Sequence, residues 1–174
     1  MVFLGRFDDK ENVAVKQMKD EYFVKPEALK AFVEELKLMH RLKHPNIVNI
    51  IGAMIEYDPT QSLFPCMVME AVDTNLRDAL RGPPMSVDVK IEISRQLADA
   101  LLYLRTRDPV ILHCDVKPEN IMMTKNGVSK LSDFGLAKQR SSAGFSKVTS
   151  LEIKGTYSYM VSLVFLYILC SYFL

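Results

Sequence analysis

Two short polar segments constrain this chain more than any other part of its sequence. The first is HCDVKPEN at residues 113–120, and the second is DFG at residues 133–135. Together they place two carboxylates, a lysine and a carboxamide on two neighbouring loops. Carboxylate and amide oxygens are the hard ligands that suit Mg²⁺, and a lysine can steady a phosphoryl group. This inventory predicts a site for magnesium and a triphosphate beside a hydroxyl nucleophile.

Composition and charge exclude several other classes of protein. The 174 residues are 49% apolar and 25% charged, as in ordinary soluble globular proteins. The net charge of +1 gives no overall basic field that would indicate nucleic acid. Cys66, Cys114 and Cys170 have no metal-binding spacing, and they are typical of free thiols in a reducing compartment. We therefore expect a cytoplasmic protein.

The first part of the chain predicts a small antiparallel sheet with one helix. Short apolar runs at 2–7 and 12–18 flank a polar turn, which is a hairpin pattern. Apolar residues at spacings of three and four predict a helix over 26–42, with a stripe made by Leu29, Phe32, Val33, Leu36 and Met39. Two more strand-like runs follow at Ile47–Tyr57 and Pro65–Ala71.

Lys16 and two glutamates of the predicted helix are candidate functional residues. In the second strand Lys16 shares a face with the small Ala14. Lys16 is therefore either a half-exposed surface lysine or an ammonium that binds phosphate, with Ala14 leaving room for a flat ring. Glu34 and Glu35 are either a solvated acidic face or the source of a partner for Lys16.

The second part of the chain predicts helices and a hairpin around the two polar segments. A composition change at residues 73–75 indicates a linker, and helices are expected at 76–81 and 86–106. Residues 110–112 predict a strand, and an Asn126-Gly127 turn predicts a hairpin from 121–124 to 128–132. Residues 135–150 are expected to form a loop. The buried stripe of the long helix is expected to comprise Ile91, Ser94, Leu97, Leu101 and Leu104.

Five motifs stand in a fixed order: AVK, a helical glutamate, HPNIV, HxDxKxxN and DFG. In this order they resemble a eukaryotic protein kinase catalytic domain, from Val2 to about Met160. The resemblance implies an α+β, two-lobed fold. Residues 1–72 would form the small sheet lobe, and residues 73–160 would form the start of a mainly helical large lobe. Residues 161–174 would be a hydrophobic tail outside the family pattern.

The resemblance also implies a role for each site residue. The catalytic set would be Asp115, Lys117, Lys16 and Glu35. The nucleotide would be bound by Val2, Ala14, Lys16, Met69, Glu70, Val72, Met122 and Asp133, with Glu70 and Val72 acting through their backbone and Met69 at the gatekeeper position. Asn120 and Asp133 would be the magnesium ligands. A hydrophobic spine would comprise Met39, Ile50, His113 and Phe134.

The implied function is a protein kinase that uses ATP and Mg²⁺ to phosphorylate a protein substrate. The KPEN form of the loop favours serine/threonine specificity, and the sequence is similar to the tyrosine-kinase-like group. One alternative is a non-catalytic, kinase-like module that binds a nucleotide or a partner. A small-molecule phosphotransferase is a further alternative, and the presence of HPNIV, KPEN and DFG in one chain argues against it.

Three departures from the family pattern bear on activity. The family's GxGxxG loop would precede Met1, the arginine of the HRD motif is Cys114, and Val161-Ser162-Leu163 replaces APE. Loss of two charge-assisted hydrogen bonds, each about 1.5–3 kcal/mol, would weaken nucleotide binding. We therefore expect little or no turnover by this chain. Cys114 cannot pair with a phosphorylated loop as a guanidinium does, so we expect no such switch.

The tail at 155–174 carries no charged residue over its length. As a helix it would be about 30 Å long, close to the thickness of the hydrocarbon core of a membrane. Three interpretations remain open. The tail could belong to a truncated or mis-spliced product, anchor the chain to a membrane, or pack on the large lobe.

Overall fold

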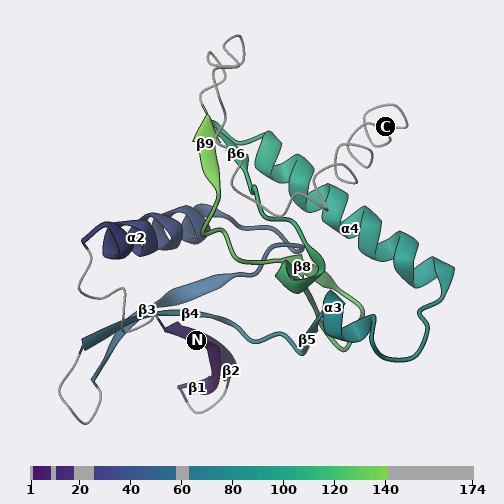
Figure 1. Cartoon of the computed structure of the whole chain (residues 1–174), viewed down its shortest axis with the longest axis horizontal. Coiled ribbons are helices and arrows are strands. Elements are labelled where there is room, and N and C mark those ends of the chain that lie inside the picture. Colours follow the sequence, from purple (N-terminus) through teal and green to yellow (C-terminus); the bar gives the residue numbers. More distant parts are fainter. Residues whose placement is uncertain (1, 9–10, 18–25, 58–62, 141–174) are drawn as a thin grey trace. The chain divides into compact units, whose positions relative to one another are not determined.

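The computed structural model describes residues 2–8, 11–17, 26–57 and 63–140 (Figure 1). The chain divides into two compact units. Unit 1 comprises Met1–Lys43 and Val48–Val72, and unit 2 comprises His44–Ile47 and Asp73–Leu174. The expectations for the loop beyond residue 140 and for the tail concern residues outside the described ranges.

Unit 1 is built on a four-stranded antiparallel sheet. Its strands are β1 (Val2–Phe7), β2 (Glu11–Gln17), β3 (Ile50–Tyr57) and β4 (Leu63–Glu70). Their order across the sheet is β1-β2-β4-β3, with β1 and β2 forming the predicted hairpin. This arrangement confirms the small antiparallel sheet of the α+β class.

In unit 1, helix α2 spans Pro26–Arg41 and contacts β3 (Figure 1). Its buried residues are Phe32, Leu38 and Met39, whereas Leu29 of the predicted stripe is 41% exposed. Helical periodicity defines a stripe but not the stretch of helix that meets the sheet. The prediction was therefore wrong for Leu29 and missed Leu38.

The described residues of unit 2 form two helices and two small sheets around the polar segments. Its elements are β5 (Thr74–Asn75), α3 (Leu76–Ala79), α4 (Val87–Arg105), β6 (Val110–Leu112), the 3-10 turn η1 (Pro118–Asn120), β7 (Ile121–Met123), β8 (Ser129–Leu131) and β9 (Lys138–Arg140). One sheet has the order β5-β7-β8, and β6 pairs with β9 in the other. Gly127, with a φ of 78°, occupies the left-handed conformation in the predicted turn between β7 and β8.

The long helix α4 begins where its capping residue predicts, but it buries a different face. The side chain of Ser86 accepts a hydrogen bond from the backbone of Val89. The buried residues of α4 are Ile93, Gln96, Ala100 and Leu104, of which only Leu104 belongs to the predicted stripe. Ile91 is 61% exposed. The stripe is shifted because α4 packs on β6 and β8, where Gln96 accepts a hydrogen bond from the backbone of Ser129 at 2.5 Å.

Residues 138–140 form a strand where the sequence predicts a loop. The three residues of β9 are polar, so no hydrophobic alternation marks them. They pair antiparallel with β6, with Ile111 opposite Gln139. Cross-strand hydrogen bonding thus sets this strand, and the prediction of a continuous loop from residue 135 was wrong here.

The segment His44–Ile47 joins unit 2 although it follows α2 directly in sequence. Asn46 donates from its side chain to the Ser129 carbonyl and accepts from the Leu131 N–H, both at 2.9 Å. Ile47 forms a parallel bridge with Leu131. The strand that was predicted to start at Ile47 therefore starts at Ile50.

Within the described residues, no helix has both the length and the apolar character needed to cross a bilayer.

Candidate active site

In unit 1, Lys16 of β2 forms an ion pair with Glu35 of α2. The Lys16 Nζ lies 2.7 Å from Glu35 Oε1, and the two side chains are 28% and 9% exposed. Glu34 instead faces Lys37 at the exposed surface, at 3.2 Å. The strand lysine therefore has a nearly buried partner, which holds its ammonium group in one direction.

The strand register places four predicted nucleotide-binding residues on one face of the unit 1 sheet. Val2 lies opposite Lys16, and Ala14 lies opposite Met69. Directly opposed residues of antiparallel strands share a face, as do residues two apart on one strand. Val2, Ala14, Lys16 and Met69 therefore line the same side of the sheet.

The chain leaves the sheet through Glu70, whose backbone nitrogen is already engaged. It donates to the Asn49 carbonyl at 3.0 Å, while the Glu70 side chain accepts from the Asn49 N–H at 2.7 Å. If the Glu70 backbone contacts adenine as predicted, the contact would therefore be made by the Glu70 carbonyl and not by its N–H. Val72, the other predicted backbone contact, is half-buried at the end of unit 1.

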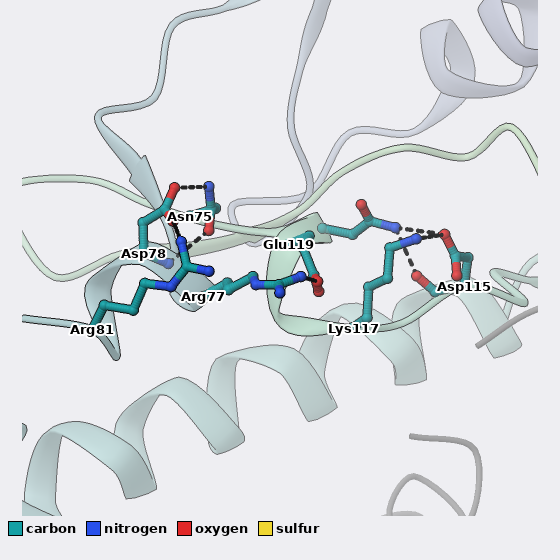
Figure 2. A network of polar contacts seen from close by, with 8 residues as sticks. Asn75, Arg77, Asp78, Arg81, Asp115, Lys117 and Glu119 are labelled. Carbon is teal, nitrogen blue, oxygen red and sulfur yellow. Dashed lines mark hydrogen bonds and ion pairs between the residues drawn. The ribbon is translucent and has the colours of Figure 1, made fainter. Parts of the chain in front are cut away.

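In unit 2, three predicted site residues meet within one loop, and Figure 2 labels two of them, Asp115 and Lys117. The Lys117 Nζ lies 2.6 Å from Asp115 Oδ2. The amide nitrogen of Asn120 donates to that same oxygen at 2.9 Å and to the Asp115 carbonyl at 2.8 Å. Asp115 is thus a nearly buried carboxylate that receives two donors. Its hydrogen bond to Lys117 raises the pKa of the lysine and keeps it cationic.

His113 supports this loop from the core of the unit. The Asp115 N–H donates to His113 Nδ1 at 3.3 Å, so the ring proton lies on Nε2, which donates to the Ser132 carbonyl at 3.0 Å. The ring meets Phe134 edge-on, with centroids 4.6 Å apart. Burial lowers the pKa of His113 and favours its neutral form. These two members of the predicted spine therefore touch.

The DFG segment separates a buried anchor from an exposed carboxylate. Phe134 is 2% exposed, whereas Asp133 is exposed and has a φ of 62°, in the left-handed region. Just before it, Ser132 donates to the Asn120 carbonyl from its backbone at 2.9 Å and from its hydroxyl at 3.0 Å. Ser132 thereby links the loop of Asp115 to the segment that carries Asp133.

Sequence reasoning missed three residues that make contacts between this loop and neighbouring segments: Ser132, Glu119 and Arg77. Arg77 of α3 forms an ion pair with Glu119 of η1, the residue that precedes Asn120 (Figure 2). The two residues are 42 positions apart, so no local pattern could have paired them. A signal existed for Ser132, because it is a polar residue between a buried strand and the DFG segment.

Cys114 stands where the family has an arginine, and it has a φ of 65°. Its thiol donates to the Leu112 carbonyl at 3.5 Å. Burial raises the pKa of this thiol, so it stays neutral at physiological pH. A neutral thiol at this position cannot provide the positive charge of the arginine that it replaces.

The side-chain oxygens of Asn120 and Asp133 in unit 2 are of the type that binds a magnesium ion together with a nucleotide. Both hydrogen bonds of the Asn120 amide nitrogen go to Asp115, which leaves the amide oxygen as the atom for a cation. Mg²⁺ usually takes one or two protein oxygens together with phosphate and water. Among the described residues, no group of three or more His, Cys, Asp or Glu side chains could hold a metal ion.

The predicted site residues thus form two sets, each gathered within one unit. Unit 1 holds Val2, Ala14, Lys16, Glu35, Met69, Glu70 and Val72. Unit 2 holds Asp115, Lys117, Asn120, Met122 and Asp133. Met122 is half-buried on β7, where it lies opposite Asn75 of β5.

Comparison with known proteins gives one family. The family described as "Protein kinase domain" matches residues 1–162. The chain is 30% identical over 160 residues to G-type lectin S-receptor-like serine/threonine-protein kinase CES101 of Arabidopsis thaliana, covering 91% of this chain and 18% of that protein. It is 31% identical over 160 residues to "Probable serine/threonine-protein kinase PBL21" of the same plant, covering 91% of this chain and 41% of that protein. The chain therefore spans less than half of either relative.

Both the ordered motifs and the match across most of the chain lead to one assignment: the chain belongs to the protein kinase domain family.

Proposed function

We propose that this chain carries the catalytic set of a serine/threonine protein kinase, which transfers the γ-phosphate of ATP to a protein hydroxyl. The observation that carries the proposal is the cluster of Asp115, Lys117 and Asn120 in one loop of unit 2. Phosphoryl transfer asks a protein mainly for positioning and charge neutralisation, and this cluster supplies both.

Each residue of the cluster has a distinct task in the proposal. The Asp115 carboxylate accepts the proton of the substrate hydroxyl and orients it. Lys117, held cationic by Asp115, neutralises charge on the transferring group. The Asn120 oxygen and the exposed Asp133 carboxylate hold magnesium. When bound, magnesium neutralises negative charge on the phosphate oxygens.

The unit 1 set has the task of holding the nucleotide. The shared face of Val2, Ala14 and Met69 offers an apolar wall for a flat base, and Lys16 lies on that same face. The ion pair with Glu35 directs the Lys16 ammonium, which is the arrangement expected for a phosphate contact.

The substrate class rests on resemblance. The KPEN form of the loop and the names of the two relatives both point to serine or threonine as the acceptor. A cytoplasmic location remains a prediction from the scattered cysteines. The competing candidate is a kinase-like module that binds a nucleotide or a partner without transferring phosphate.

Parallel measurements of nucleotide binding and phosphate transfer test the proposal. The chain is titrated with magnesium and an ATP analogue, while chemical shifts are recorded because they report weak and tight binding alike. Transfer from labelled ATP to a generic basic protein is followed separately. Asp133→Asn and Lys16→Met remove a proposed magnesium ligand and a proposed phosphate contact. Lys37→Met is the matched control, since Lys37 is an exposed lysine of α2.

We expect saturable, magnesium-dependent binding that Asp133→Asn and Lys16→Met weaken and Lys37→Met leaves unchanged. Transfer that disappears in Asp115→Asn would support an active kinase. Binding with little or no transfer, which the departures from the family pattern lead us to expect, would favour the non-catalytic module for this chain. If the chain bound no nucleotide at millimolar concentrations, the kinase and the nucleotide-binding module would both be wrong, and only a module that binds a partner would be left.

A further inference from the structure

We propose that the ion pair between Arg77 and Glu119 is a positioning contact that fixes the η1 turn, and with it the side chain of Asn120. Its relevance to magnesium and nucleotide rests on the function proposed above. The contact itself is a property of unit 2, so it can be tested without any ligand.

The turn has few internal contacts of its own. Its backbone bonds run from the Asn120 N–H to the Lys117 carbonyl, at 2.9 Å, and from the Ile121 N–H to the Pro118 carbonyl. No side chain caps its first residue, and Pro118 has no N–H to donate. Short 3-10 turns have poorer hydrogen-bond geometry than α-helices. Contacts from outside the turn must therefore hold its conformation.

Such contacts reach the turn through two adjacent residues. Asn120 is tied to Asp115 through its amide nitrogen and to Ser132 through its carbonyl. Glu119 instead extends to Arg77 of α3, as Figure 2 shows. The Arg77 contact thus links the turn to α3, whereas the contacts of Asn120 link it only to Asp115 and Ser132.

The two carboxylate oxygens of Glu119 have different surroundings. Oε1 binds Arg77, whereas Oε2 is buried and has no hydrogen-bond partner among the described residues. The side chain as a whole is 32% exposed, so the pair contributes no more free energy than a surface ion pair. Its effect on the turn is a restraint on geometry: without Arg77 the Glu119 side chain would be free to rotate towards water, and the turn would lose this outside contact.

The short helix α3, which carries Arg77, is held at its first turn by the side chain of Asn75. The Asn75 side chain caps α3 by accepting from the Asp78 N–H at 2.9 Å, and it also donates to the Asp78 carboxylate at 2.8 Å. The backbone of Asn75 pairs with Met122 of β7, the strand that directly follows η1. The cap, the strand pair and the ion pair together close a ring of contacts around the turn.

A charge swap in the whole chain tests the contact. The variants are Arg77→Glu, Glu119→Arg and the double variant that carries both. Arg77→Lys keeps the charge but not the guanidinium. Arg81→Ala is the matched control, because Arg81 pairs with Asp78 at 3.2 Å and does not contact the turn. The readout is hydrogen exchange of the Asn120 and Ser132 amides, together with the melting temperature.

Each single charge reversal should lower the protection of the Asn120 amide roughly fivefold, as expected for a partly exposed ion pair. The double variant should recover most of that protection, Arg77→Lys should keep part of it, and Arg81→Ala should leave it unchanged. Unchanged protection in both single variants would overturn the proposal. An equal loss in the single and double variants would also overturn it, because the effect would then not come from the pair.

The same variants connect the contact to the proposed function. The magnesium-dependent part of nucleotide affinity should fall in both single variants and recover in the double variant, while binding measured in chelator should not change. If the wild-type chain bound no nucleotide, the proposed function would fail and the exchange result would still decide the role of the pair. If nucleotide bound but the single variants lost none of the magnesium dependence, the pair would have no positioning role in the site.

Discussion

Two lysine–carboxylate pairs, one in each unit, have nearly the same local geometry and opposite origins. Lys16 and Glu35 are 2.7 Å apart with 28% and 9% exposure, and Lys117 and Asp115 are 2.6 Å apart with 26% and 9% exposure. The first pair joins a strand to a helix across 19 residues, whereas the second spans two residues of one loop. The two pairs therefore depend on different parts of the structure, although their distances are nearly equal. The first pair requires α2 to be docked, and the second requires the shape of the loop.

The surroundings of the two pairs extend this contrast. The Asp115 carboxylate receives a second donor from Asn120, and its loop is connected to the core through His113 and Ser132. The Lys16 pair is reached through the register of β2 and the packing of α2 on β3. Changes in the core of unit 2 should therefore alter the loop pair and leave the Lys16 pair intact.

The largest effect is expected from Phe134→Ala. Phe134 is nearly fully buried and its ring packs against His113, so its removal should destabilise unit 2 by about 3–5 kcal/mol. Denaturant unfolding, with hydrogen exchange resolved by residue, measures this loss. Leu136→Ala, at an exposed position two residues away, is the control. Equal loss of protection around Lys16 would show that the two pairs are not independent.

Asn120→Ala should have the next largest effect. It removes two hydrogen bonds and leaves the buried carbonyl of Asp115 without that donor, at a cost of roughly 2–3 kcal/mol. Exchange of the amides in residues 113–121 should speed up, while those of β2 keep their rates. The control is Asn12→Ala, at an exposed position in β2. A loss below that of the control would mean that Asn120 does not organise the loop.

Glu35→Gln should have a smaller effect, because Lys16 retains some contact with water. We expect a loss of at most about 1 kcal/mol in unit 1 and none in unit 2. The neighbouring Glu34→Gln is a close control, since it removes a charge from the exposed pair with Lys37. If the two variants gave the same melting temperature, the Lys16 pair would contribute no more than a surface ion pair.

The stability of the fold should change gradually with pH because of His113. Burial lowers the pKa of the folded His113 below its ordinary value of 6.5, so the unfolded chain binds more protons in mild acid. The stability contributed by the neutral ring is therefore complete above about pH 6.5 and is lost as the pH falls. Protonation would also place a proton on Nδ1, which accepts from Asp115. The folded ring should titrate by NMR below pH 6.5, and His113→Gln should reduce the slope of stability against pH. A ring that titrated above 6.5 would contradict this account.

Local signals in the sequence predicted much of the fold and the site. Alternation and turn residues predict the β1–β2 and β7–β8 hairpins, and Ser86 marks the start of α4. The Asp115, Lys117 and Asn120 contacts lie within six residues, so their motif contains most of the geometry.

Features set by tertiary partners escaped sequence reasoning. The buried face of α4 depends on β8, and it includes the polar Gln96 instead of the neighbouring Leu97 of the predicted stripe. The polar strand β9 exists through its pairing with β6. Arg77 meets Glu119 across 42 residues, and neither residue carries a local pattern that selects the other.

One titration tests most directly whether the Asn120 oxygen and the Asp133 carboxylate of unit 2 hold magnesium together with a nucleotide. The affinity of the chain for an ATP analogue is measured by chemical shifts with magnesium and with chelator, in the wild type, Asp133→Asn and the exposed control Asp88→Asn. The account predicts that magnesium strengthens binding in the wild type and in Asp88→Asn, with the largest shifts at Asn120 and Asp133, and that Asp133→Asn removes this gain. Equal affinity with and without magnesium in the wild type would contradict it.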